Sequence, residues 1–249
     1  METTLKSNFQ SEAVRTENLG KRFGDFDAVK NLNLSVRRGE IFGFLGANGA
    51  GKTTAIRMLC GLLEPSSGTG YVAGFDISRQ PEEIKRRIGY MSQKFSLYED
   101  LTIDENIEFY GGVYGLARES LWQKREALVE ELGLSDQRDM LTVSLPLGFK
   151  QRLALSCALL HEPEIIFLDE PTGGVDPDAR RNFWDLIYQL SDQGRTVFVT
   201  THYMDEAEYC QRVSIMYRGE IAALDTPDGL KRRYGKSTME EVFIHLVDK

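Results

Sequence analysis

One stretch of the chain has the residue types and the spacing of a phosphate-binding loop. Residues 46–54 read Gly-Ala-Asn-Gly-Ala-Gly-Lys-Thr-Thr and match the pattern G-x-x-x-x-G-K-[ST]. Glycines let the backbone wrap closely around an anion, so that its N–H groups surround the phosphate oxygens. The lysine adds a mobile positive charge, and the hydroxyl of Thr53 can hold Mg²⁺. The residues expected to bind a nucleotide here are Gly46, Asn48, Gly49, Ala50, Gly51, Lys52, Thr53 and Thr54.

A second set of candidate residues is a pair of acids at the end of an apolar run. Residues 165–168 read Ile-Ile-Phe-Leu, as expected of a buried strand, and Asp169 and Glu170 follow directly. Two carboxylates in this position stay ionised only beside a cation or water. Asp169 is therefore predicted to reach Mg²⁺ through its water shell, and Glu170 to polarise an attacking water as general base. Taken alone, Asp-Glu-Pro-Thr is also compatible with a simple helix-capping turn.

Two further polar residues follow expected strands. Gln93 comes after a strand predicted at residues 87–91 and offers a neutral oxygen to a metal ion or to water, although a solvated loop glutamine is the alternative. His202 follows a strand predicted at residues 196–200 and could donate a hydrogen bond to a γ-phosphate. A single histidine carries little weight by itself. The predicted catalytic residues are Glu170, His202 and Gln93, and the predicted metal ligands are Thr53, Gln93 and Asp169.

These residues need a framework of strands and helices to bring them together. An apolar run at 40–45 and a helical pattern at 54–60 flank the glycine loop, so the loop joins a strand to a helix. Strands alternate with helices along the rest of the chain, which predicts an α/β fold with a mostly parallel sheet and helices on both faces. Other expected strands lie at 14–19, 32–36, 213–217 and 220–224, other expected helices at 177–190, 227–234 and 239–246, and a Gly/Pro/Ser-rich break at 64–70.

The domain organisation follows from the same pattern. Residues 1–12 are polar and are expected to form a mobile N-terminal tail, while residues 13–249 form one domain. From Ile103 to about Gly133 the pattern is helical, which predicts a helical subdomain at about residues 95–160 within the sheet-based core.

Composition narrows the class of protein. Apolar residues make up 41% and charged residues 27% of the 249 residues, as is usual for soluble globular proteins. The formal net charge of −8 argues against nucleic acid as a primary partner, because nucleic-acid-binding domains usually carry basic surfaces. No apolar stretch approaches about 18 residues, and the first residues lack the apolar core of a signal peptide. We therefore expect a cytoplasmic protein that does not itself span a membrane.

The order of these motifs resembles that of the nucleotide-binding subunits of ATP-binding cassette (ABC) transporters. The resemblance covers residues 13–235 and is strongest for the separately encoded ATPases of bacterial exporters. It implies a P-loop NTPase core with a mostly parallel sheet, an N-terminal antiparallel β subdomain and an inserted helical subdomain. The segments that carry it are residues 46–54, Gln93, 147–152, 165–171, 174–177 and 200–202.

The resemblance also implies roles for particular residues. Phe23 would stack on adenine, and His202 would sense the γ-phosphate, with Glu170 as the catalytic base. Asp176 would lie on the loop that crosses to a second subunit. Residues 95–98 would border the groove that receives a coupling helix of the membrane partner.

One segment departs from the family's pattern. The signature loop of such proteins reads Leu-Ser-Gly-Gly-Gln and closes over ATP held by the opposite subunit. The aligned residues here are Leu145, Pro146, Leu147, Gly148 and Phe149. Pro146 has no hydroxyl and no backbone N–H, and Leu147 places a side chain where a glycine is usual. Gly148 and the helix that follows can still offer N–H groups and a positive dipole to a phosphate, so we expect a weakened signature.

The function implied is that of an ATP-hydrolysing subunit of an ABC membrane transporter, with an exporter favoured over an importer. Mg-ATP would bind between two cassettes, in a homodimer or a heterodimer, and dimerisation and hydrolysis would drive an integral-membrane permease. The cassette would then lie at the cytoplasmic face of the cell membrane. Two alternatives stay open: a soluble ABC ATPase that acts on ribosomes or DNA, and a regulatory module that holds ATP without hydrolysing it.

Overall fold

The computed structural model describes residues 11–94 and 96–248 of the chain. Most of the tail predicted at residues 1–12 lies outside these residues, but its last part is described. Strand β1 begins at Glu12, which pairs with Arg37, and the Arg38 N–H donates to the Ser11 carbonyl at 3.0 Å. The prediction of a tail is therefore wrong for residues 11 and 12, because their backbone groups bond to the neighbouring strand and its turn.

Four strands between residues 12 and 76 form an antiparallel sheet with the strand order β2-β1-β4-β5. Its strands are β1 (Glu12–Phe23), β2 (Phe26–Arg37), β4 (Ser67–Val72) and β5 (Phe75–Asp76). The break predicted at 64–70 is wrong in its second half, because β4 starts at Ser67 and pairs with β1. Gly68 lies so close to β1 that a Cβ there would be 2.2 Å from the Asn18 carbonyl oxygen. The glycines that suggested a break thus permit this close strand pairing.

The second sheet has the strand order β10-β9-β3-β8-β7-β6 and carries the candidate residues. Its strands are β3 (Ile41–Leu45), β6 (Ile88–Met91), β7 (Ile165–Asp169), β8 (Thr196–Thr201), β9 (Arg212–Tyr217) and β10 (Glu220–Asp225). All neighbouring pairs are parallel except β9 and β10, which are antiparallel and form a hairpin at the strands expected at 213–217 and 220–224. The carboxyl ends of the parallel strands therefore meet at one edge, where ligands bind in open α/β sheets.

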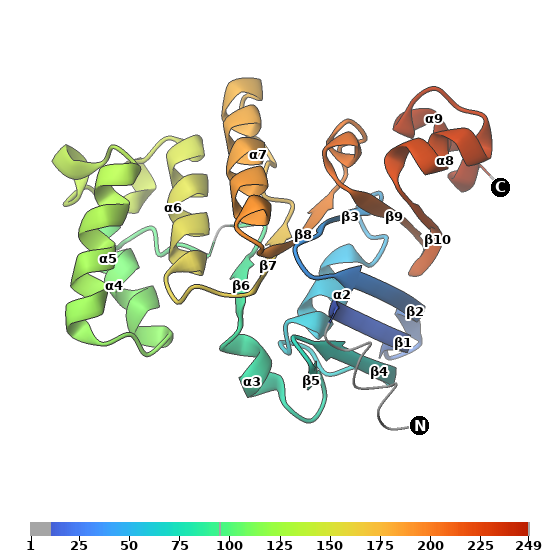
Figure 1. Ribbon diagram of the computed structural model, residues 1–249, viewed down its shortest axis with the longest axis horizontal. Coiled ribbons are helices and arrows are strands. Elements are labelled where there is room, and N and C mark those ends of the chain that lie inside the picture. Colours follow the sequence, from blue (N-terminus) through green and yellow to red (C-terminus); the bar gives the residue numbers. More distant parts are fainter. Residues whose placement is uncertain (1–10, 95, 249) are drawn as a thin grey trace.

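Helices surround this sheet and also form a separate lobe (Figure 1). The helices are α2 (Lys52–Leu59), α3 (Pro81–Lys85), α4 (Ile103–Val113), α5 (Arg118–Glu131), α6 (Leu147–Leu159), α7 (Pro177–Asp192), α8 (Pro227–Tyr234) and α9 (Met239–Val247). Short 3-10 turns lie at Ser135–Gln137, Thr142–Ser144 and Glu206–Tyr209. Several helices start at side-chain caps, and Thr102 and Glu105 form a full capping box at α4.

Three clusters of buried side chains hold the layers together. On one face of the parallel sheet, the rings of Phe42, Phe44 and Phe198 contact one another and pack against α2 and the antiparallel sheet. On the other face, apolar residues of α7, α8 and α9 cover the strands. Helices α4, α5 and α6 share a third cluster, which gives the lobe at the left of Figure 1 a core of its own. Among the described residues, no helix is both long and apolar enough to cross a membrane.

Candidate nucleotide-binding site

The glycine loop runs from the end of β3 to the start of α2, as the sequence predicts. Two of its glycines are required by close packing. A Cβ on Gly46 would lie 2.5 Å from the Met216 carbonyl oxygen, and one on Gly51 would lie 2.4 Å from the Ala28 carbonyl oxygen. Gly51 also has φ +106°, which other residues rarely adopt. The loop is thus held against β2 and β9 in a conformation that aims the start of α2 at the sheet edge.

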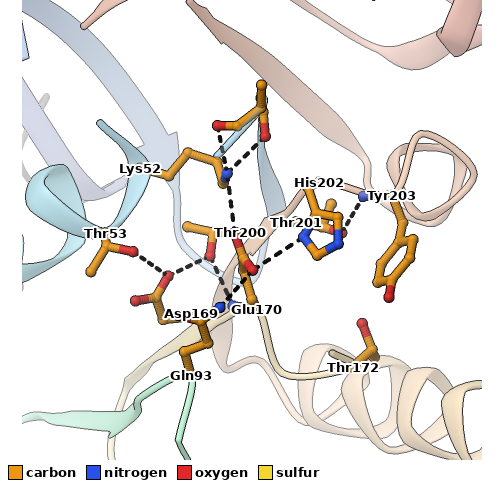
Figure 2. A network of polar contacts seen from close by, with 12 residues as sticks. Lys52, Thr53, Gln93, Asp169, Glu170, Thr172, Thr200, Thr201, His202 and Tyr203 are labelled. Atoms are coloured by element: carbon orange, nitrogen blue, oxygen red, sulfur yellow. Dashed lines mark hydrogen bonds and ion pairs between the residues drawn. The ribbon is translucent and has the colours of Figure 1, made fainter. Parts of the chain in front are cut away.

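Lys52 lies at the centre of the loop and is only 4% exposed. Its ammonium group donates to the carbonyl oxygens of Gly46 at 2.7 Å and Ala47 at 3.2 Å. It also forms an ion pair with Glu170 Oε1 at 3.2 Å, shown in Figure 2. Because both charges are buried, each compensates the desolvation of the other.

Glu170 is the residue on which the candidate side chains converge (Figure 2). Besides Lys52, its Oε2 atom accepts from Gln93 Nε2 at 3.0 Å and lies 3.1 Å from His202 Nδ1. Its backbone has φ +49°, a left-handed conformation that is strained for a residue that carries a Cβ. The Glu170 N–H donates to the Thr200 hydroxyl at 2.9 Å, which helps to hold this conformation. The structure therefore brings together all three residues predicted to be catalytic.

Asp169 lies one residue before Glu170 and is 1% exposed. Its Oδ1 atom accepts hydrogen bonds from the Thr200 hydroxyl at 2.7 Å and the Thr53 hydroxyl at 3.1 Å. Burial raises the pKa of its carboxyl above the ordinary value of 3.8, although both hydroxyls act in the opposite direction. A carboxylate beside a hydroxyl is a pair of hard oxygen ligands of the kind that Mg²⁺ prefers, so these residues fit the predicted metal.

We expect Asp169→Asn to stabilise the nucleotide-free protein at pH 7 while it removes the Mg²⁺ dependence of nucleotide binding. A carboxyl whose folded-state pKa is raised contributes its full stability below its unfolded pKa and loses it as the pH rises through the folded value. The buried charge of Asp169 therefore lowers the folding stability of the wild type at neutral pH. Asparagine removes this charge, and its side-chain oxygen can still accept the hydrogen bonds from both hydroxyls.

Thermal unfolding curves recorded at pH 7 and near pH 4 test the stability arm of this prediction. The advantage of the asparagine variant should shrink at the lower pH, because the raised pKa of Asp169 lets the folded-state carboxyl take up a proton as the pH falls. The exposed Asp100 provides the control, because Asp100→Asn should change neither unfolding nor Mg²⁺ dependence. An asparagine variant that is less stable than the wild type at pH 7 would contradict the assigned cost of burial.

A cavity of about 490 Å³ opens beside these residues. It is lined by Phe23, Phe26, Ala28, Asn48, Gly49, Gly51, Lys52, Thr53, Thr54, Gln93 and Glu170. Phe23 is 49% exposed, so its ring is accessible, as the predicted stacking role requires. Phe26 is 65% exposed and pairs with Phe23 across the turn of the β1-β2 hairpin. Sequence analysis missed Phe26, although two aromatic residues flanking Gly24-Asp25 were a visible signal.

Ala50 and Gly46 were predicted to contact a nucleotide but do not line this cavity. Ala50 is 6% exposed, and its N–H donates to the Ala47 carbonyl at 3.1 Å within the loop. Both residues therefore contribute to the packing and the hydrogen bonds of the loop and not to the surface of the cavity.

Gly148 and Asp176 lie away from the cavity and beside each other. Asp176 caps α7 by accepting from the Ala179 N–H at 2.9 Å, and a Cβ on Gly148 would lie 3.3 Å from the Ala179 Cβ. Leu147 is 40% exposed at the start of α6. Neither Gly148 nor Asp176 is among the residues that line the cavity beside Lys52.

Comparison with known proteins was consistent across sequence and structure. The family model described as "ABC transporter" matches residues 29–173, which is more than half of the chain. The Escherichia coli (strain K12) protein "Probable multidrug ABC transporter ATP-binding protein YbhF" is 50% identical over 98% of this chain and 43% of its own length. The chain thus spans about two fifths of that relative. The Bacillus subtilis (strain 168) "Linearmycin resistance ATP-binding protein LnrL" is 36% identical over 93% of this chain and 75% of its own length.

Among solved structures, the dimeric structure of a post-hydrolysis state of the ATP-binding cassette MJ0796 bound to ADP and Pi resembles the chain with a TM-score of 0.77. The two are 26% identical, and the alignment covers 86% of this chain and 98% of that one. The fold expected from the sequence is thereby confirmed. With the motif order, the geometry around Glu170 and these similarities in agreement, the chain belongs to the ABC transporter family, as one of its ATP-binding cassettes.

Proposed function

We propose that the chain hydrolyses ATP and thereby drives export through a separate integral-membrane permease, working from the cytoplasmic face of the cell membrane. In this proposal residues 13–249 act as one ABC domain, with residues 95–160 as its helical subdomain. The observation that carries the proposal is the buried Glu170 carboxylate, which meets Lys52, Gln93 and His202 in one cluster. A module that only stored ATP would have no need for a carboxylate placed to accept a proton.

The contacts of Glu170 support a role as general base. An incoming phosphate competes with the carboxylate for the Lys52 ammonium group, because both are anions and Lys52 is the cation in the loop. Binding of ATP then frees Oε1 of Glu170, which can accept a proton from water attacking the γ-phosphate. His202 and Gln93 both lie at Oε2 and keep the carboxylate oriented. Thr53 and Asp169 would hold Mg²⁺, which would supply positive charge beside the phosphates.

The aromatic residues of the β1-β2 turn fit the base of the nucleotide. Phe23 and Phe26 present exposed rings and line the same cavity as Glu170. Stacking of a base on an aromatic ring contributes about 1–3 kcal/mol. We assign Phe23 to stack on adenine, as the sequence predicted, and Phe26 to border the same face.

A second cassette completes the site in this proposal. Gly148 and Asp176 do not reach the cavity in their own chain, so they can act only at the site of another copy or of a different cassette. Each hydrogen bond to a charged group contributes about 1.5–3 kcal/mol. Loss of the serine hydroxyl at Pro146 therefore weakens closure, and a partner with a complete signature would close more firmly over this chain's ATP.

The relatives and the surface favour an exporter with a membrane partner. One relative is named for multidrug transport and the other for linearmycin resistance, and we extend export of such compounds to this chain as part of the proposal. The expected docking segment at 95–98 is described except for Phe95. Its Tyr98 is 44% exposed, and the centre of its ring lies 4.5 Å from the centre of the Phe109 ring in an edge-to-face arrangement. These two rings offer an apolar surface to a permease helix. The net charge of −8 disfavours the alternative of a ribosome- or DNA-bound ATPase.

The size of Glu170→Gln protein in solution tests the dimerisation step. We expect a dimer with Mg·ATP and a monomer with Mg·ADP, because the variant binds ATP without consuming it. In the same background, Pro146→Ser with Leu147→Gly should lower the ATP concentration needed for dimerisation, since it restores a hydroxyl and removes the exposed leucine. A monomer with saturating Mg·ATP in both variants would show that the chain does not dimerise with itself and would direct the search to a different cassette.

A further inference from the structure

A buried carboxylate next to the proposed site has no role in the mechanism above. Glu206 begins the 3-10 turn Glu206–Tyr209 after β8 and is 0% exposed. A buried carboxylate is costly unless it is paired and hydrogen-bonded. Its Oε1 atom accepts from the Thr172 hydroxyl and lies 3.7 Å from Arg180 Nε. Within the described part of the chain, Oε2 has no hydrogen-bond partner. Such a residue is poorly explained by stability alone.

Thr172, the first partner of Glu206, lies in the turn that follows the proposed catalytic residue Glu170. Thr172 is 1% exposed and lies two residues after Glu170, in the turn closed by the Gly173 N–H bond to the Glu170 carbonyl at 3.2 Å. On its other side, the same turn is held by Gln151 of α6, which donates to the Pro171 carbonyl at 2.6 Å. The segment that keeps Glu170 in its left-handed conformation is therefore anchored by Glu206 through Thr172 and by α6.

Arg180, the second partner of Glu206, is connected to His202 through the ring of Tyr203. Arg180 of α7 places its guanidinium carbon 4.2 Å from the centre of the Tyr203 ring. The ring of Tyr203 in turn lies 4.2 Å from that of His202, centre to centre. Figure 2 shows Tyr203 beside His202, with Thr172 below Tyr203 in this view. The Tyr203 ring thus supports one side of His202, while Arg180 supports the Tyr203 ring.

We propose that Glu206 is a positioning residue that fixes Glu170 and His202 relative to each other. Through Thr172 it holds the turn that carries Glu170, and through Arg180 it holds Tyr203 against His202. The two side chains must meet at one water or phosphate, so a common anchor sets their relative geometry. This inference rests on the proposed ATP hydrolysis. The inference also links α6 and α7 to the proposed catalytic residues, because Gln151 of α6 holds the turn after Glu170 and Arg180 of α7 contacts Tyr203.

The test combines two near-isosteric variants with a matched control. Glu206→Gln removes the buried charge that faces Arg180, whose exposed acidic partner Asp205 remains at 3.6 Å, and Thr172→Val removes the hydroxyl donor. Either change should lower kcat by about 10- to 100-fold, with the KM for ATP unchanged, because small displacements of reacting groups have effects of this size. Thr172→Ser should keep the wild-type kcat because it keeps the hydroxyl. The double variant should be slower by less than the product of the two single effects, since the Thr172 contact is one of the two through which Glu206 acts.

Glu208→Gln is the control, because Glu208 lies in the same 3-10 turn, is exposed, and pairs with Lys231 at 2.8 Å. It should leave kcat unchanged. Thermal unfolding of each variant confirms that the assay temperature lies below the transition. If Glu206→Gln does not fold, the Thr172→Val and Thr172→Ser pair carries the kinetic test.

A second measurement does not depend on turnover. In protein labelled with ¹⁵N-histidine, the ring signals of His202, assigned with His202→Gln, should shift in Glu206→Gln and in Thr172→Val but not in Glu208→Gln. Wild-type protein without ATP hydrolysis would overturn the proposed function, and the ring signals would still decide this inference. Active, folded Glu206→Gln and Thr172→Val proteins with wild-type kcat and unchanged His202 signals would overturn the inference alone.

Discussion

Replacing Lys52 by alanine is expected to weaken ATP binding by about 100-fold or more. The side chain of Lys52 is 4% exposed and lines the cavity, and its ammonium group is held by hydrogen bonds to two loop carbonyls. In the complex it is the charge that meets the phosphates, and two hydrogen bonds between charged groups contribute about 1.5–3 kcal/mol each. Since 1.4 kcal/mol corresponds to a factor of ten, their loss gives the expected effect. Calorimetric titration with Mg·ATP measures it directly.

The variant also leaves Glu170 as a buried carboxylate without its ion-pair partner, which destabilises the fold. The double variant Lys52→Ala with Glu170→Gln separates the two effects. It should recover most of the thermal stability while ATP binding stays weak. Lys30→Ala serves as the surface control, because Lys30 lies on the neighbouring strand β2 and its side chain is 40% exposed. Wild-type affinity in Lys52→Ala would show that the loop does not bind phosphate.

Glu170→Gln is expected to lower the rate of ATP hydrolysis by about a thousandfold while ATP still binds. General bases contribute about 10²- to 10⁴-fold to rate, and glutamine keeps the size of the side chain but cannot accept a proton from water. The buried ion pair with Lys52 is lost, which leaves the lysine free for phosphate and keeps binding intact. Single-turnover hydrolysis and equilibrium binding of the same preparation give the two quantities.

Glu164→Gln is a suitable comparison for this variant, since Glu164 directly precedes strand β7 and forms exposed ion pairs with Arg38 and Arg87. Exposed pairs of this kind contribute about 0–1 kcal/mol, so turnover should stay at the wild-type rate. Hydrolysis that continues in Glu170→Gln at a similar rate would assign the base to another group. The left-handed backbone at position 170 would then need a different explanation.

Much of the framework was predictable because it depends on local pattern. Apolar runs such as Phe42–Leu45 and Ile165–Leu168 mark buried strands, and polar residues directly after such runs mark the edge of a parallel sheet. The helix Pro227–Tyr234 was predicted with its observed bounds, since Thr226 caps its start and Gly235 ends it. Strand β4 was missed because glycines weaken strand propensity, and only the pairing with β1 compensates for that weakness.

Taken by itself, the sequence identified the residue types that we expect to face a nucleotide, because the glycine loop and the acids after β7 are local patterns with few physical uses. Tertiary structure decided how these residues pair. Gln93 and Glu170 are 77 positions apart, yet their side chains share a hydrogen bond, and Thr172 and Glu206 meet from the segments that follow β7 and β8. Such contacts depend on the order of the strands, on the left-handed backbone of Glu170 and on which polar side chains the fold buries. These properties arise from packing of the whole chain, so no local stretch encodes them.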